Sequence, residues 1–155
     1  MRSIIRRGAS CLGAAAAIIA ATEGTAQAGP GDNGTDPRSG PNVCANGAQW
    51  IATRGIETEL GQVVTNVDVY YSPRCLTNWI SVRSNPAGGR TAKDLGSDTA
   101  GWLPTENDYG TGASISMQVY APGSSCIHFQ VHLYYPNGSH YAETYVAGSN
   151  TITIC

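Results

Sequence analysis

The chain has 155 residues, of which nine are basic and eleven acidic, and a formal net charge of −2 at neutral pH. A mildly acidic chain without a cluster of lysines and arginines lacks the basic patch that nucleic acids and anionic membrane surfaces require. These two classes of partner are therefore not expected.

Residues 1–28 have the pattern of a secretory signal peptide. Three arginines lie within the first seven residues, the short apolar run LGAAAAIIAA follows, and Ala26-Gln27-Ala28 fits a cleavage site. The apolar run is too short to span a bilayer, which needs about 20 residues. We therefore predict an extracellular protein without a membrane anchor, which begins near Gly29 and is long enough for one domain.

Residues 29–43 are rich in glycine, proline, aspartate and asparagine and show no apolar periodicity. This composition predicts a flexible arm. The single domain is then expected over residues 44–155. At its start, residues 50–60 fit either a short helix or a strand, and the sequence leaves that choice open.

Four cysteines follow the predicted cleavage point: Cys44, Cys75, Cys126 and Cys155. An even number of cysteines in an exported chain indicates two disulfides, for which three pairings are possible. A zinc site is not expected, because the paired Cys-x-x-Cys spacing is missing. We predict Cys44 with Cys75 and Cys126 with Cys155, since each bridge closes a loop of about 30 residues and braces one half of the domain.

Apolar and polar side chains alternate through most of the domain, with the period of two that is typical of half-buried strands. The segments with this pattern are residues 62–72, 75–83, 113–121, 126–135, 140–147 and 151–155. Asn137-Gly138, between two of them, predicts a tight hairpin with a type I′ turn. The predicted fold class is all-β, a small antiparallel β-sandwich or barrel stapled by two disulfides.

Cys75 and Trp79 fall on one face of the segment 75–83, two alternations apart. A large ring on the same face as a disulfide can cover the bridge and exclude water from it. We therefore expect this tryptophan to lie in the core and not to face a ligand.

Residues 84–112 have no clear strand pattern, and a loop of this length often marks a binding site or an irregular insertion. It contains Trp102 and Tyr109, and Tyr134 lies on the polar face of a predicted strand. Large rings with a polar edge stack on sugars and form protein contacts, so these three residues are predicted to bind a ligand. The abundance of tyrosine also agrees with β-strand propensity alone.

Two groups of side chains have the residue types that hydrolysis or metal binding requires. The segment 84–112 contains four carboxylates that could supply an acid and base pair for glycoside-type hydrolysis: Asp94, Asp98, Glu106 and Asp108. His128 and His132, two of the three histidines, share a strand face but lie about 13 Å apart, which is too far to share one metal ion. No catalytic residue, metal or cofactor is therefore assigned from the sequence.

The stretch VDVYYSPRCLTNWISV, preceded by GTDPRSGPNVCANGAQW, resembles an actinobacterial family known only as domain of unknown function 2690. The matching residues are Gly34, Asp36, Pro37, Cys44, Tyr71, Ser72, Pro73, Cys75 and Trp79. The resemblance covers residues 34–82 well and the second half more loosely. It implies an exported or domain-fused β module without an assigned activity, and it supports the Cys44–Cys75 pairing. Relatives often carry extra cysteines before the Asp-Pro, and an acidic residue where this chain has Asn46.

These observations favour a non-catalytic extracellular or cell-envelope binding module, with a polysaccharide or an envelope component as its ligand. One alternative is a small secreted hydrolase that uses the carboxylates of residues 84–112. Another is a secreted inhibitor-like protein, which would need a rigid exposed loop.

Overall fold

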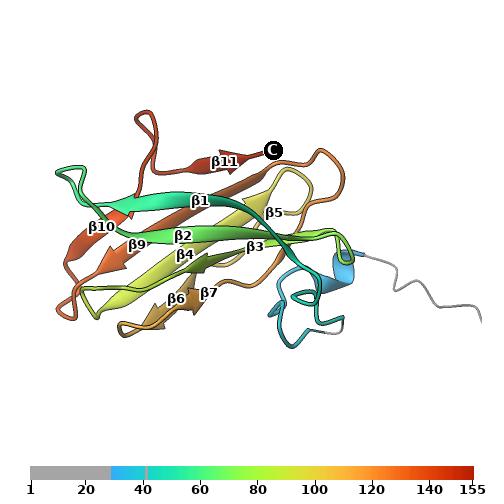
Figure 1. The fold of residues 1–155 in the computed structure, drawn as a ribbon, viewed down its shortest axis with the longest axis horizontal. Helices are drawn as coiled ribbons and strands as arrows, with labels where there is room; N and C mark the ends of the chain where they lie inside the picture. Colours follow the sequence, from blue (N-terminus) through green and yellow to red (C-terminus); the bar gives the residue numbers. More distant parts are fainter. Residues whose placement is uncertain (1–28, 41) are drawn as a thin grey trace, which may run out of the picture.

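The computed structural model describes residues 29–40 and 42–155, and the predicted signal peptide lies outside the described residues. The described chain forms one antiparallel β-sheet of eleven strands that curls around a single main core (Figure 1). This confirms the predicted all-β class. Within the described ranges, no helix is long and apolar enough to cross a membrane.

The strand order in the sheet is β5-β4-β9-β10-β1-β2-β3-β7, while β6 pairs with β4, β11 with β9 and β8 with β3. A 3-10 turn, η1 (Pro30–Asp32), precedes the strands. The strands are β1 (Gln49–Glu57), β2 (Val63–Ser72), β3 (Thr77–Val82), β4 (Arg90–Ser97), β5 (Gly101–Trp102), β6 (Glu106–Tyr109), β7 (Ser114–Ile115), β8 (Val119–Tyr120), β9 (Ile127–Tyr134), β10 (His140–Thr144) and β11 (Ile152–Ile154).

Strand β9 shows how the sequence pattern builds the core. Its odd-numbered residues are buried and its even-numbered residues are half-buried, without exception along the strand. Successive side chains of a strand point to opposite faces, so one face of β9 is apolar and the other polar. The apolar face, with the chain's single phenylalanine Phe129, packs against inward-facing side chains of β1, β2, β3, β4, β10 and β11.

The segment 84–112 is not a long loop, and that prediction is wrong. It contains β4, which pairs with β9 over seven residues, together with the short strands β5 and β6. The alternation is hidden because the inward face of β4 carries Thr91, Lys93 and Ser97 beside its one large apolar residue, Leu95. A strand with polar residues on both faces gives no periodic signal.

Of the segment 50–60, for which the sequence left helix or strand open, residues 50–57 are strand and belong to β1, which pairs with both β2 and β10. The segment 113–121 forms two short strands, β7 and β8, because side chains interrupt the ladder between them: the Ser116 hydroxyl accepts the backbone N–H of Ile80.

The hairpin predicted at Asn137-Gly138 joins β9 to β10, but its turn is not of type I′. The Gly138 N–H donates to the Tyr135 carbonyl oxygen at 2.9 Å, and within this turn only Gly138 has a positive φ, of 84°. Pro136 occupies the second position, where its fixed φ suits a type I turn. The hairpin is therefore a type I turn followed by a left-handed glycine, a common alternative.

Both predicted disulfides are confirmed: Cys44–Cys75 and Cys126–Cys155. Their sequence separations are 31 and 29 residues, for which the chain-entropy model gives about 3–4 kcal/mol of stabilisation each. Disulfides form and persist in oxidising environments such as the cell exterior.

Trp79 packs against the Cys44–Cys75 bridge, as expected, and only 4% of its surface is exposed. The bridge and the indole do not belong to the main core, however. They form a second, smaller cluster with Tyr70, whose ring stacks on Trp79 at a centroid distance of 5.7 Å. Ala45 and Ala48, which follow Cys44 in the chain, pack against the cluster.

Residues 29–40 are docked on the sheet, in contrast to the flexible arm that the composition predicts. The Gly34 N–H donates to the Gln118 carbonyl oxygen at 2.8 Å, and the Gln118 N–H donates to the Thr35 carbonyl oxygen at 2.9 Å. The Gln118 side chain, which is fully buried, also donates to the Thr35 hydroxyl. Composition misses this arrangement because the pairing joins residues more than 80 positions apart.

We predict that the two disulfides differ in their resistance to reduction under native conditions. Cys44 and Cys75 are fully buried, whereas Cys155 is exposed and Cys126 half-buried. Thiol exchange requires access to a sulfur, so dithiothreitol should open Cys126–Cys155 first. Timed alkylation followed by peptide mass spectrometry measures the order, and equal rates for the two bridges would contradict this prediction.

Candidate functional site

The polar face of β9 and its neighbours is organised in cross-strand rows. One row joins Trp102, Gly96, His128 and Thr153 through the pairings of β5, β4, β9 and β11. The next contains Asp94 opposite Gln130, and the following one His132 opposite Glu143. We call this surface, over β5, β4, β6, β9, β10 and β11, the outer face.

Trp102 stands at one end of the outer face with 54% of its surface exposed. It lies opposite Gly96, and a Cβ at that glycine would come within 3.0 Å of the indole atom Cδ2 and equally close to the β5 backbone, 2.9 Å from the Gly101 carbonyl oxygen. The missing side chain thus makes room for the ring on the sheet. The His128 ring lies next to it, at a centroid distance of 6.3 Å. The indole is therefore exposed but held in place.

A shallow hollow of about 370 Å³ adjoins this indole and is lined by Asp94, Trp102, Leu103, Thr105 and Gln130. The Thr105 hydroxyl donates to Asp94 Oδ1, and Gln130 Nε2 donates to Thr151. Within the described chain, these bonds leave Asp94 Oδ2 and Gln130 Oε1 as acceptors without a recorded partner. The hollow therefore combines an apolar ring with two hydrogen-bond acceptors.

Tyr109 and Tyr134, the other two predicted binding residues, lie at the opposite end of the outer face. Tyr109 pairs with Arg90 across β6 and β4, and the Arg90 guanidinium lies 3.9 Å from the centre of the Tyr134 ring. Arg90 and Gly96 are six positions apart on β4, which corresponds to about 20 Å. The structure thus places the three predicted residues on one side of the sheet but brings only the two tyrosines together.

The four predicted carboxylates are divided between the two faces of β4. Asp94 and Asp98 belong to the outer face, where Asp98 Oδ1 lies 2.8 Å from His128 Nε2. Glu106 and Asp108 lie opposite Lys93 and Thr91, whose side chains point inward. Glu106 and Asp108, two positions apart on β6, are therefore the only pair of the four that shares a face and a strand.

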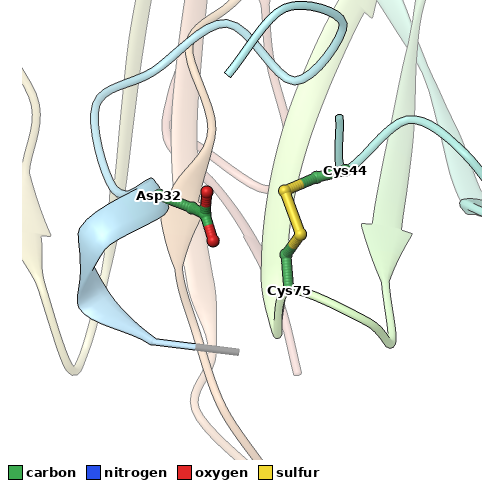
Figure 2. Close-up of side chains that lie close together, drawn as sticks. All are labelled: Asp32, Cys44 and Cys75. Atoms are coloured by element: carbon green, nitrogen blue, oxygen red, sulfur yellow. A yellow bond between two sulfur atoms is a disulfide. The ribbon is translucent and has the colours of Figure 1, made fainter. Parts of the chain in front are cut away.

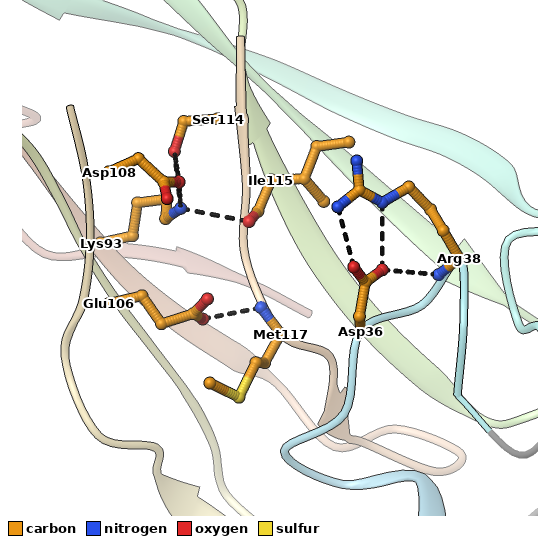
Figure 3. A network of polar contacts seen from close by, with 8 residues as sticks. All are labelled: Asp36, Arg38, Lys93, Glu106, Asp108, Ser114, Ile115 and Met117. Carbon is orange, nitrogen blue, oxygen red and sulfur yellow. Dashed lines mark hydrogen bonds and ion pairs between the residues drawn. The ribbon is translucent and has the colours of Figure 1, made fainter. Parts of the chain in front are cut away.

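These two carboxylates join a polar network that closes the curled sheet (Figure 3). Lys93 Nζ, on a side chain that is 1% exposed, lies 2.5 Å from Asp108 Oδ2, and it donates to the Ser114 hydroxyl and the Ile115 carbonyl oxygen. β4 lies near one edge of the sheet and β7 at the other. Side chains thus connect the two edges where a closed barrel would have a backbone ladder.

The environments of Glu106 and Asp108 shift their pKa values in opposite directions. Burial raises the pKa of Glu106, although its carboxylate accepts the Met117 N–H at 2.6 Å. Burial also acts to raise the pKa of Asp108, but hydrogen bonds from Lys93 and Ser114 outweigh it and lower that pKa on balance. Such divergence is also found in acid and base pairs. Here Asp108 bonds to Lys93 of β4 and Ser114 of β7, and Glu106 bonds to Met117 between β7 and β8, so both groups hold the curled sheet together. The hydrolase alternative stays a prediction.

The described residues contain two groups whose side-chain atoms lie close enough to hold a metal ion. One consists of Asp32, Cys44 and Cys75, and Figure 2 shows the carboxylate turned toward the two sulfurs. Both sulfurs are committed to a disulfide, so this group has no thiolate to offer a metal. Asp32 is 2% exposed, and its Oδ2 accepts from Asn42 at 2.8 Å; it anchors the docked segment beside the bridge.

The second group consists of His132, His140 and Glu143. His128 and His132, which the sequence places too far apart to share an ion, are indeed separate: the first contacts Asp98 and the second Glu143. His140 was missed as a neighbour of His132 because eight positions and a turn separate them. The hairpin signal at Asn137-Gly138 could have indicated that residues on both sides of the turn meet.

Comparison of the chain with protein-family models, with curated proteins and with solved structures gives no match. The resemblance to domain of unknown function 2690 therefore stays a prediction.

We predict that Asp108→Asn lowers the free energy of unfolding at pH 7 by about 1–2 kcal/mol. The substitution leaves the buried Lys93 cation without its counter-charge, and the half-exposed position of Asp108 keeps the loss below that of a buried ion pair. Because the folded-state pKa of Asp108 is lowered, its stabilisation is complete above the ordinary value near 3.8 and is lost as the pH falls through the folded value. Urea unfolding from pH 3 to pH 7 measures the difference between the two proteins, which should shrink at the acidic end.

Glu106→Gln is the matched control on the same strand. A carboxyl whose pKa is raised stabilises the fold only at low pH, and this contribution is lost as the pH rises through the folded value. The amide oxygen of Gln can still accept the Met117 N–H, so little stability should be lost at pH 7. Equal destabilisation by the two substitutions would contradict the assigned roles.

Proposed function

We propose that this protein is an extracellular binding module for a polysaccharide or a similar hydroxyl-rich polymer, and that Trp102 is its principal contact. The observation that carries the proposal is the exposed indole, seated on Gly96 beside a shallow polar hollow. An exposed tryptophan held in one orientation loses little conformational entropy when a ligand binds. A non-catalytic role agrees with carboxylates that are dispersed or engaged between strands.

The chemistry of the hollow indicates the ligand class. The apolar face of a sugar ring packs on an aromatic side chain, and its hydroxyl groups donate hydrogen bonds at the edge. Asp94 Oδ2 and Gln130 Oε1 are acceptors placed for such donors. The rings at the far end of the outer face, about 20 Å away along the strands, favour an elongated ligand over a small molecule.

The extracellular location is part of the proposal. Two disulfides support an oxidising compartment, and the pattern of residues 1–28 is that of a signal peptide. The inhibitor-like alternative would need a rigid exposed loop, whereas residues 90–97 form a paired strand; it stays a prediction.

Trp102→Ala tests the proposal by co-sedimentation with insoluble polymers: peptidoglycan sacculi, chitin and cellulose. We expect the chain to sediment with at least one of them and the variant to bind about tenfold more weakly, as for a central aromatic contact. Trp50→Ala is the matched control, since Trp50 is 61% exposed on β1 and does not line the hollow. Thermal unfolding verifies that both variants fold. Absence of binding to all three polymers, or equal binding by Trp102→Ala, would overturn the proposal.

A further inference from the structure

We propose that His132, His140 and Glu143 form a binding site for a divalent transition metal ion of the Zn²⁺ type. The site lies on the outer face over the β9–β10 hairpin, away from the Trp102 hollow. It is independent of the proposed polysaccharide binding and stands on the geometry of these three side chains.

The spacing of the donor atoms agrees with a metal of this kind. Glu143 Oε2 lies 3.0 Å from His132 Nδ1 and 3.8 Å from His140 Nε2, and one ligand atom from each residue lies within 4.8 Å of the other two. Tetrahedral ligands at about 2.0–2.1 Å from Zn²⁺ are about 3.3–3.4 Å apart. The three side chains therefore need only small movements to share one ion.

A β-bulge brings the three side chains to one face. Residues three positions apart on a regular strand, such as His140 and Glu143, point to opposite faces. Here the register shifts between His140 and Ala142, so that His140 lies opposite Tyr134 and Glu143 opposite His132. The extra residue in β10 turns His140 to the face that Glu143 and His132 already share, which is the usual effect of a bulge on side-chain direction.

The three side chains are supported by their neighbours and are still accessible. Their side-chain exposures are 18% for His132, 33% for His140 and 32% for Glu143. The His140 ring meets the edge of the Tyr134 ring at a centroid distance of 5.7 Å, which limits its rotation. An ion can therefore enter from solvent, and the histidine is held near its partners before the ion arrives.

The charge around the site favours a cation. His140 and Glu143 line a hollow of about 400 Å³ together with Glu57, Glu59 and Tyr145. Glu57 lies opposite Glu143 across β1 and β10, so a second carboxylate is next to the first. Three protein ligands leave one coordination position open toward this hollow for a water molecule, whereas structural zinc sites have four protein ligands.

The ligand set also indicates which ions bind. Imidazole nitrogens suit Zn²⁺, Cu²⁺ and Ni²⁺, whereas Ca²⁺ and Mg²⁺ prefer oxygen ligands in larger numbers. We therefore expect Zn²⁺ to bind at this site and Ca²⁺ and Mg²⁺ not to displace it.

The test is calorimetric titration of the full chain with Zn²⁺, without a histidine tag and with free thiols blocked by iodoacetamide. We expect saturable binding of one equivalent, unaffected by Ca²⁺ or Mg²⁺. His132→Ala, His140→Ala and Glu143→Gln should each weaken it at least about tenfold, because even the loss of an outer-shell partner costs that much. Absorption of the Co²⁺-loaded chain gives a second readout, since these variants should change its visible spectrum.

His128→Ala is the matched control, because His128 lies on the same strand and face and also contacts a carboxylate, that of Asp98. This variant should bind Zn²⁺ as the unmodified chain does. The proposal is overturned if the chain shows no saturable binding, or if His128→Ala weakens binding as much as His132→Ala, which would indicate unspecific capture by surface histidines.

Discussion

The alternation of apolar and polar side chains along β9 is the constraint on which both the core and the outer face depend. β9 pairs with β4, β10 and β11, so its register decides which side chains of those strands point inward. A shift of one residue would bury its histidines and expose Phe129. The polar groups at both candidate sites lie outward because this register directs the apolar set into the core.

The curled sheet brings a second constraint, which is the closure of its two edges. An open edge presents unpaired N–H and C=O groups. In this protein the Lys93 network connects β4 and β6 with β7, and the Ser97 hydroxyl donates to the Tyr120 carbonyl oxygen of β8 at 2.7 Å. The polar side chains on the inward face of β4 therefore hold the two edges together. The same contacts between the edges position Glu106 and Asp108.

The two proposed sites share the outer face but depend on different local features of the strands. Trp102 is seated on the sheet because Gly96 leaves room for its ring, and His140 joins His132 because β10 contains a bulge. Neither Trp102 nor His140 belongs to the main core. Features that the core does not require are reasonable candidates for a functional origin.

The amino-acid sequence by itself determined most of the strands with clear alternation, the position of the β9–β10 hairpin and the two disulfides, because each depends on local periodicity, a short turn signal or cysteine number and spacing. It could not reveal β4, whose inward polar residues erase the alternation, or the docking of residues 29–40, whose partner Gln118 is remote in the chain. Only the tertiary structure decided that the four acidic residues separate onto two faces and that His132, His140 and Glu143 meet. The physical reason is that strand register, bulges and edge closure are set by hydrogen bonds between distant segments, while a sequence pattern reports only which face of one segment is buried.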